Sequence, residues 1–450
     1  MSRLREGVTP AYLALCLVLG GSGQGIWGNL LLQLLALAIL AWALLSRPRG
    51  GLSRAAASLR LLVLASVLLV LIQLVPLPPA VWSRLPGRAF VVDGYQMLGL
   101  PLPWLPISLA PAATLASALN LLPPLAIVAG ILRLGAFRAR WLAVAVVGGA
   151  VAGAMLGALQ AATGSGYLYA FTTPGRAAGF FANANYMGTL LLAALPFLAA
   201  LVARVGKTAS TTTRKRLGAW GVGAGAALII LLGLALNGSA ATALLAVPVL
   251  IGCAALLAGR RPRVQAWLAL SAVAAVLAGA LLVATVPSLS STEAAVSVAT
   301  RQDIWARSLQ ITGDHLPLGA GLGTFPALYP RYEDANAVDW IYVNHVHNDY
   351  LELVLEAGLP ALLLLGAFLF WWVSRAWALW RPAGGRGMAR AASIASAAIL
   401  AHSAVDFPVR TAAIAATLAA CVALMAEPNA RRRDAESGIR ARPARHLTLG

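Results

Sequence analysis

The chain has 450 residues, of which 60% are hydrophobic and only 11% are charged, and its mean hydropathy is +0.80. This composition excludes a soluble globular domain, which has no use for so much apolar surface. The formal net charge of +19 would suit a nucleic-acid partner. The basic residues, however, gather between long apolar runs, so we expect no nucleic acid as a partner and membrane lipids instead.

The apolar runs predict an all-α, polytopic bundle of about twelve transmembrane helices, because lipid offers the backbone no hydrogen bonds and each span needs about 20 apolar residues. The first run follows Arg3 and Arg5 and has some features of a signal peptide, but a second run comes soon after it, so a retained span is expected. The predicted spans cover residues 9–21, 26–46, 57–76, 111–132, 141–161, 183–203, 218–236, 240–259, 264–286, 350–373, 390–405 and 409–426.

The positive charges indicate the topology. With the N-terminus in the cytoplasm, 27 of the 34 Lys and Arg residues fall on the cytoplasmic side, as the positive-inside rule requires. We therefore expect a multi-pass membrane protein with both termini in the cytoplasm and a disordered basic tail over residues 427–450. The other side carries only Arg84, Arg88, Arg176, Arg301, Arg307, Arg331 and Arg410.

Three segments are predicted to face outward. The first, residues 77–110, is rich in proline and is expected to form a packed cap. The second, residues 162–182, contains Arg176 and leads into Asn183, Asn185 and Tyr186. The third, residues 287–350, is the longest polar stretch of the chain and contains seven of its fifteen acidic residues, so this loop is the expected place for chemistry.

Within the third segment, residues 299–311 have helical periodicity. Val298, Ile304, Trp305 and Leu309 are expected on one face together with Arg301, whereas Arg307 is expected on another. An arginine on the apolar side of a short amphipathic helix either extends along the membrane surface or presents its guanidinium group to an anion. The periodicity alone leaves both interpretations open.

Residues 317–325 contain three closely spaced glycines. No strand precedes them and no lysine follows them, so a nucleotide-binding loop is not indicated. A tight turn is expected.

The loop closes with Asn344, His345, His347, Asn348, Asp349, Tyr350 and Glu352. Asp349 and Glu352 have the spacing of a capping box, so Asn348 or Asp349 is expected to begin the tenth span. His347 then lies just before that helix, either as an ordinary interfacial residue or as a reagent. Neither histidine has the spacing of a metal-binding pair, and the three cysteines Cys16, Cys253 and Cys421 lie singly in apolar runs. No metal, cofactor or disulfide is expected.

Few ionisable groups lie deep inside the predicted spans; Glu352, Glu356 and Asp406 lie near outer ends. Ion-coupled transporters usually keep charged groups near the middle of the bilayer, so this distribution lowers the case for a transporter without excluding it.

Three stretches resemble the O-antigen ligase and polymerase superfamily: RAAGFFANANYMGTLLLAALP from Arg176, RQDIWARSLQITGDHLPLGAGLGTFPALY from Arg301, and HVHNDYLELVLEAGLPALLLL from His345. The resemblance covers most of residues 57–426 and is most specific in the late loop. It divides the chain into N-terminal spans (1–56), a ligase- or polymerase-like membrane domain (57–426, with the loop 287–350) and the tail.

The resemblance implies a metal-independent, inverting glycosyltransferase of the bacterial inner membrane. Such an enzyme takes a glycan from undecaprenyl diphosphate at the periplasmic face and transfers it to a lipid A core sugar or to another glycan. By motif, His347 corresponds to the family's general base and Arg301 to a diphosphate-binding arginine, so both are assigned as catalytic. Substrate-binding roles are expected for Arg176, Asn183, Asn185, Tyr186, Arg307, Asn344, His345, Asn348, Asp349 and Tyr350.

The chain departs from the family pattern in two places. Many members carry a second arginine at the outer end of the seventh to eighth span, where this chain has Gly238 and Ser239 and no arginine. We hypothesise that Arg176 replaces it. His345 is the other departure, because it makes two candidates for one base, of which we favour His347.

Two further functions remain open on the sequence. One is a membrane transporter of a small anion or solute on the same fold, in which Arg301 and His347 line an entry site. The other is a structural scaffold in a polysaccharide export complex. The sequence does not separate ligase from polymerase.

Overall fold

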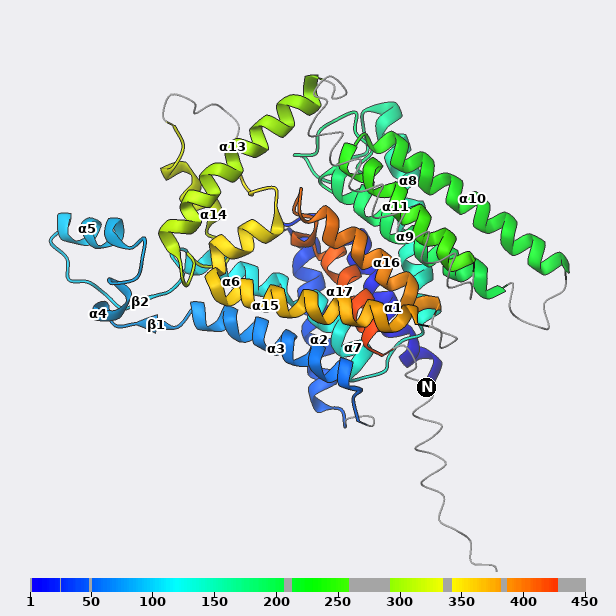
Figure 1. The fold of residues 1–450 in the computed structure, drawn as a ribbon, viewed down its shortest axis with the longest axis horizontal. Coiled ribbons are helices and arrows are strands. Elements are labelled where there is room, and N and C mark those ends of the chain that lie inside the picture. Colours follow the sequence, from blue (N-terminus) through cyan, green and yellow to red (C-terminus); the bar gives the residue numbers. More distant parts are fainter. Residues whose placement is uncertain are drawn as a thin grey trace, which may run out of the picture.

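The computed structural model describes residues 2–24, 26–47, 51–205, 213–258, 292–334, 342–381 and 387–427. This part of the chain is almost entirely helical, as the apolar runs predict. Figure 1 shows the helices running obliquely past one another, with one group of short elements projecting from the bundle at the left.

The elements follow the chain in this order: α1 (Ser2–Leu19), α2 (Trp27–Leu45), α3 (Arg54–Gln73), β1 (Pro76–Leu77), α4 (Pro79–Trp82), α5 (Ala89–Met97), β2 (Leu105–Pro106), α6 (Pro111–Asn120), α7 (Leu122–Leu132), α8 (Ala139–Thr163), α9 (Ala184–Val205), α10 (Thr213–Asn237), α11 (Ala240–Leu257), α13 (Thr292–His315), α14 (Phe325–Leu328), η2 (Tyr329–Arg331), α15 (Asp349–Trp380), α16 (Gly387–His402), η3 (Pro408–Arg410) and α17 (Ala412–Ala426).

Eight helices in the described ranges are long and apolar enough to cross a membrane. They are α2, α3, α6 with α7, α8, α9, α10, α11 and α15, and each matches a predicted span. The helices α1, α16 and α17 also coincide with predicted spans, but they are not among the eight. The predicted span over residues 264–286 and the predicted tail after Glu427 lie outside the described residues, so the count of about twelve stays a prediction.

Helix α9 is the centre of the bundle. Nearly all of its side chains from Ala184 to Ala200 are buried, and α8, α10, α11 and α16 pack around it. The largest hydrophobic cluster extends from there to α1, α2, α7 and α17. Small residues such as alanine dominate α16 and α17, which allows the helices to approach closely.

A second, smaller hydrophobic cluster lies outside the bundle and supports the loop elements. It joins Ile304 and Ile311 of α13 to Phe325 and Leu328 of α14, and to Val346 just before α15. The loop that the sequence predicts to be polar is therefore folded onto a core of its own, and that core gives α13 and the segment before α15 fixed positions.

The predicted helix at residues 299–311 lies within α13, but the predicted face is partly wrong. Ile304 is buried, whereas Leu309 is exposed. The buried side of α13 runs through Ile304, Ser308 and Ile311, because the packing surface comes from α14 and α15. Nothing is described for the side chain of Val298.

Helix α15 is broken at Gly358, whose φ of 64° and ψ of −154° are not helical. A side chain at this position would collide with the backbone of the glycine-rich turn, since a Cβ atom on Gly358 would lie 2.1 Å from the carbonyl oxygen of Pro317. Only glycine combines this backbone conformation with so close an approach. The turn thus packs directly into the break in the helix.

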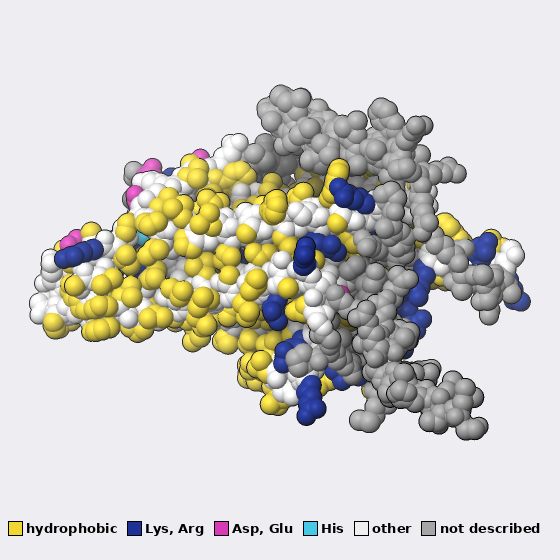
Figure 2. All heavy atoms as spheres, turned by 60° about the horizontal axis from the view of Figure 1, so that its bottom comes forward, with side chains coloured by type: hydrophobic (Ala, Val, Ile, Leu, Met, Phe, Trp, Pro, Cys, Tyr) yellow, Lys and Arg dark blue, Asp and Glu magenta, His cyan; other side chains and the backbone are white. Residues whose placement is uncertain are grey.

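Charge is distributed unevenly over the molecule. In Figure 2 the Lys and Arg side chains gather toward the right, while hydrophobic side chains extend to the narrow left end, which α4 and α5 occupy in Figure 1. Some Lys and Arg side chains also lie at the narrow left end in Figure 2, and the orientation of the chain in the membrane stays a prediction.

Candidate active site

A cavity of about 720 Å³ lies where the loops of the bundle meet α13. Residues far apart in the sequence line it. They come from the α1–α2 loop, the segment before α9, the α10–α11 loop, α13, the segment before α15, and η3. Eight of the predicted site residues are among them: Arg176, Asn183, Asn185, Tyr186, Arg301, Asn344, His345 and His347.

His347 has an unusual backbone conformation, with a φ of 57°, and is the one described non-glycine residue with a positive φ. Such conformations cost free energy and are found most often at functional sites. The Nδ1 atom lies 3.5 Å from Oδ1 of Asp406, and the ring meets Phe407 edge-on with 4.9 Å between centroids. If Nδ1 carries the proton that faces Asp406, Nε2 is left as a proton acceptor.

Asp406 is buried behind His347 and held on several sides. Its Oδ2 accepts a hydrogen bond of 2.6 Å from Nδ2 of Asn185, and its Oδ1 accepts one of 2.9 Å from the backbone N–H of Phe407. Arg301 approaches to 3.9 Å. Burial alone would raise the pKa of Asp406, but the contact with His347 and the charges of His402 and Arg301 outweigh it and lower the pKa to about 2. The carboxylate is therefore charged and fixed in orientation at neutral pH.

Three arginines line the cavity, and two of them, Arg301 and Arg176, are not bound by the carboxylates around Arg410. Arg301 projects from α13 with its side chain about one quarter exposed (24%). Arg176 comes from the segment before α9, and its Nη1 donates to the carbonyl oxygen of Gly238 at 3.3 Å. Arg176 thus lies beside Gly238 and Ser239, the position where the sequence comparison left an arginine unfilled. Guanidinium groups placed in this way suit a phosphate-bearing ligand.

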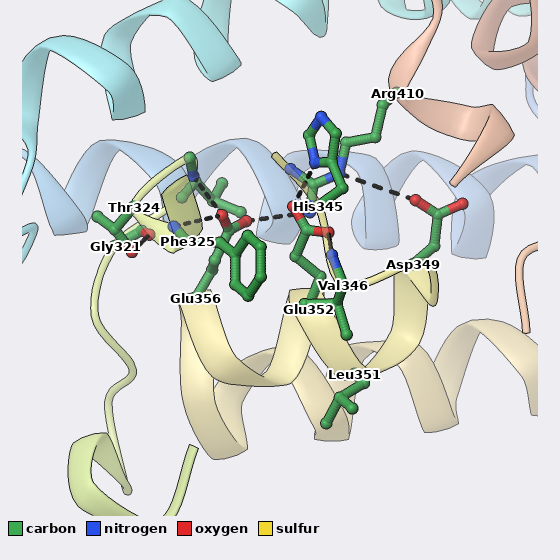
Figure 3. A network of polar contacts seen from close by, with 12 residues as sticks. Gly321, Thr324, Phe325, His345, Val346, Asp349, Leu351, Glu352, Glu356 and Arg410 are labelled. Carbon is green, nitrogen blue, oxygen red and sulfur yellow. Dashed lines mark hydrogen bonds and ion pairs between the residues drawn. The ribbon is translucent and has the colours of Figure 1, made fainter. Parts of the chain in front are cut away.

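Arg410 is the centre of a second group of charges, which Figure 3 shows at the start of α15. Its Nη2 lies 3.1 Å from Oε1 of Glu352 and 3.1 Å from Oε2 of Glu356, and its Nε lies 3.7 Å from Oδ1 of Asp349. Burial disfavours the charge of Arg410, but these carboxylates more than compensate and raise its pKa. His345 completes the group, with Nδ1 at 2.8 Å from Oε1 of Glu352.

The same group fixes the two loops around it. Glu352 accepts a hydrogen bond from the backbone N–H of Val346 at 2.9 Å, next to His347. Glu356 accepts one from the N–H of Gly323 at 2.8 Å, and Gln73 of α3 accepts one from that of Leu322 at 3.0 Å. The glycine-rich segment is a turn, as predicted, and these backbone donors bind protein carbonyl and carboxylate oxygens.

The comparison with protein families gives one match. The family model described as O-antigen ligase matches residues 225–366, about a third of the chain. This segment of the chain is therefore similar to the O-antigen ligase family. No curated protein matches the chain.

The matched range of the O-antigen ligase family contains Arg301, His345 and His347 together with Glu352 and Glu356. The other side chains of the two charge groups, Asp406 and Arg410, lie outside it, as does Arg176. Some residues of the site therefore lie inside the segment that the family model matches. The others lie far from that segment in the sequence, and the fold brings them near.

Four predicted site residues do not line the cavity. Arg307 donates from Nη1 to the carbonyl oxygen of Tyr332 at 2.7 Å. The hydroxyl of Tyr350 donates to the carbonyl oxygen of Leu400 at 2.6 Å. Asn348 is the N-cap of α15, accepting from the N–H groups of Tyr350 and Leu351. The side chain of the fourth, Asp349, faces Arg410.

The predicted capping box is only partly correct. Asn348 caps the helix, but Glu352 does not return to the N–H of the cap residue; it binds Val346, His345 and Arg410 instead. Glu352 lies four residues after the cap, one position beyond the reciprocal arrangement. Its carboxylate is fully buried, which needs a charged partner that the spacing does not reveal.

The sequence reasoning missed Asp406, Phe407 and Arg410 as parts of the site. The sequence did contain a signal for Arg410. Three acidic residues lie near the outer ends of predicted spans, and buried carboxylates need a cationic partner. Arg410 is an outward arginine at the end of such a span. In the part of the chain that the structure describes, no group of three or more His, Cys, Asp and Glu side chains has the arrangement of a metal site.

Proposed function

We propose that this protein transfers a glycan from undecaprenyl diphosphate to a sugar hydroxyl at the periplasmic face of the inner membrane, with inversion and without a metal ion. The observation that carries the proposal is the cavity itself. It joins His347, backed by the carboxylate of Asp406, to Arg176 and Arg301. Attack on a sugar diphosphate needs a base for the acceptor hydroxyl and positive charge near the leaving diphosphate, and one cavity contains both.

The base acts on the acceptor. A sugar hydroxyl is a poor nucleophile, and Nε2 of His347 takes its proton as the oxygen attacks the anomeric carbon. Asp406 holds the imidazole in the required orientation and stabilises the imidazolium that forms; it acts as a positioning residue. Since attack comes from the side opposite the leaving group, the new glycosidic bond has inverted configuration.

The arginines act on the donor. As the bond between the anomeric carbon and the diphosphate oxygen breaks, negative charge grows on the diphosphate. Arg301 and Arg176 bind that charge with guanidinium groups, which hold phosphate oxygens at two points. Because Arg301 also lies 3.9 Å from Asp406, the same carboxylate is adjacent to both base and cation.

The decisive experiment compares the two histidines. We expect His347→Ala to lower kcat with a purified lipid-linked donor by about 10²- to 10⁴-fold, the usual contribution of a positioned base. His345→Ala is the matched control, because the Nδ1 atom of His345 is already bound to Glu352. We expect the control to lose less activity than His347→Ala. Transfer at the wild-type rate by His347→Ala would remove His347 from the role of base.

The acceptor separates ligase from polymerase, and a gene deletion distinguishes them. Loss of a ligase leaves long polymer that is not attached to lipid A core, whereas loss of a polymerase leaves single repeat units. Gel profiles of lipopolysaccharide and of lipid-linked glycans from the deletion strain give the answer.

Transport of a small anion is the second candidate, and one observation favours it. The break at Gly358 in α15 lies beside buried Glu352 and Glu356, and transporters often combine broken helices with charged groups. Here both carboxylates are bound by Arg410, which favours a structural role. Uptake of labelled phosphate by proteoliposomes, abolished in Arg301→Met and without any transferase activity, would favour the transporter.

A further inference from the structure

The segment between α3 and α6 is a small hairpin that projects from the bundle. It contains β1, α4, α5 and β2, and its two short strands pair Pro76 with Pro106 and Leu77 with Leu105. In Figure 1 it forms the far left of the molecule. Both of its ends join candidate membrane spans, α3 up to Gln73 and the span that begins at Pro111. The hairpin therefore leaves the membrane and returns to it on the same side.

The hairpin exposes large apolar side chains. We define the apolar patch as Val75, Val81, Met97, Leu98, Leu100 and Trp104, which are exposed by 47% to 87%. The patch continues the exposed side of α3, where Leu68, Leu71 and Ile72 lead directly to Val75. Figure 2 shows this continuity, with hydrophobic side chains running from the helices onto the narrow end of the molecule. A contiguous exposed apolar surface of this kind marks a site that contacts a membrane or another protein.

Other residues of the hairpin hold it together and fix it to the loop elements. Nε1 of Trp82 donates to the carbonyl oxygen of Pro103 at 2.8 Å, and Arg88 donates to that of Ile107. Gly87 packs against the imidazole of His315 at the end of α13, and the guanidinium of Arg331 lies 3.6 Å above the ring of Phe90. The hairpin is therefore a folded unit, and its patch is the side left over after this packing.

We propose that the hairpin is an interfacial anchor whose apolar patch lies in the outer leaflet of the bilayer. Two observations favour lipid as the occupant. The patch is continuous with the side of α3 that a membrane would cover, and it ends in Trp104, a residue type enriched at the membrane–water boundary. The Lys and Arg side chains visible in Figure 2 gather mainly at the other end of the molecule, so apolar contact carries the attachment.

The anchor also sets the height of the catalytic cavity. The hairpin contacts α13 at His315, and the N–H of Leu109 donates to the carbonyl oxygen of Ala320 at 2.8 Å in the glycine-rich turn. Helix α13 also carries Arg301, which lies about 21 Å along the helix axis from His315 at 1.5 Å per residue. On the proposed function, the anchor holds Arg301 at the level of the donor's diphosphate, which lies at the surface of the same leaflet.

A fluorescent probe tests the anchor directly. The native cysteines Cys16, Cys253 and Cys421 are buried, so a single introduced cysteine can be labelled selectively with an environment-sensitive dye. We compare Leu100→Cys in the patch with Gln310→Cys on the exposed polar side of α13, in nanodiscs that contain lipids with a nitroxide near the top of the acyl chain. The dye at position 100 should have blue-shifted emission and lose at least half of its intensity to the nitroxide, while the dye at 310 should lose little.

Two outcomes would overturn the anchor. Water-like emission at position 100 with quenching by iodide would place the patch in solvent. Blue-shifted emission without quenching by either nitroxide or iodide would place it against protein, as in self-association of two copies. These readings need no transferase activity, so they stand even if the proposed function fails.

A kinetic measurement tests the link to Arg301. The triple variant Leu98→Ser, Leu100→Ser and Trp104→Gln should raise KM about tenfold for a donor embedded in the membrane and leave kcat unchanged. Its KM for a short-chain, water-soluble donor should stay at the wild-type value. The control, Gln310→Ser on the exposed polar side of α13, should change neither. Equal losses on both donors would show that the hairpin only supports the fold.

Discussion

Two groups of charges lie four residues apart at the turn that joins α16 to α17, and their compositions are opposite. Asp406 is a carboxylate held among His347, Arg301 and Asn185, next to the cavity. Arg410 is a cation held among three carboxylates, of which Glu352 and Glu356 are fully buried. The first group leaves cations and an imidazole facing the cavity. In the second group, His345 and Arg410 also line the cavity, but the charges bind one another and backbone donors. We infer that the first group performs chemistry and the second holds the loops.

The comparison predicts its largest effect on stability at Arg410. Arg410→Met leaves buried carboxylates without their cation, and we expect the free energy of unfolding to fall by about 3 kcal/mol, the lower end of the range for a broken buried ion pair because Arg410 is still about one fifth exposed (21%). Thermal unfolding in detergent measures it. Arg301→Met is the control and should cost less, since its contact with Asp406 is longer. Equal losses would break the distinction between the two groups.

Catalysis should depend on the first group. Asp406→Asn keeps the shape but removes the charge behind His347, so we expect kcat to fall about 10²-fold with KM for the donor unchanged. The control is Asp349→Asn, whose side chain faces Arg410 and not His347. If the control lost as much kcat at equal stability, Asp406 would have no special role as a positioning residue.

The pH dependence of stability sharpens the comparison further. The pKa of Asp406 is lowered from 3.8 to about 2 in the fold, so its charge contributes stability that is complete above about pH 4 and is lost as the pH falls toward 2. We expect this contribution to be on the order of 2 kcal/mol at neutral pH. Unfolding curves of wild type and Asp406→Asn between pH 2 and 7 should converge at the acid end. Parallel curves would contradict the assignment of this pKa.

The smallest effect is expected from a charge-conserving change. Arg301→Lys replaces a two-point donor by a single ammonium group, and we expect KM for the lipid-linked donor to rise about tenfold. The matched control on the same helix is Arg307→Lys, whose side chain binds the carbonyl oxygen of Tyr332 outside the cavity. Kinetics with purified donor distinguish them, and an unchanged KM in Arg301→Lys would remove Arg301 from the diphosphate site.

Much of the fold was accessible from the sequence because the bilayer fixes the length and polarity of a span. The eight long helices all lie on predicted apolar runs, and α13 lies where periodicity placed a helix. The face of α13 was partly missed, because Leu309 is exposed and Ser308 is buried. Periodicity gives a stripe of apolar residues, but the neighbours decide which side is covered, and these neighbours come from α14 and α15.

The site was accessible only in part. The local motif around His347 and the amphipathic position of Arg301 led to two residues that line one cavity. Asp406 and Arg410 were not found, because their partners lie some 50 or more residues away and no local spacing links them. Asp349 and Glu352 illustrate the same limit. Their spacing fits a helix cap, and the burial that makes them ion-pair partners exists only in the fold.

The break at Gly358 has a consequence for how deep the charges lie. The helical part of α15 after the break, residues 359–380, has 22 residues and spans about 33 Å, enough to cross the hydrocarbon layer by itself. We infer that the part before the break, which carries Asp349, Glu352 and Glu356, lies in the head-group region. A single long helix thus supplies both a membrane-crossing segment and a separate segment that carries the acidic residues. These acidic side chains then avoid the free-energy cost of transfer into the hydrocarbon.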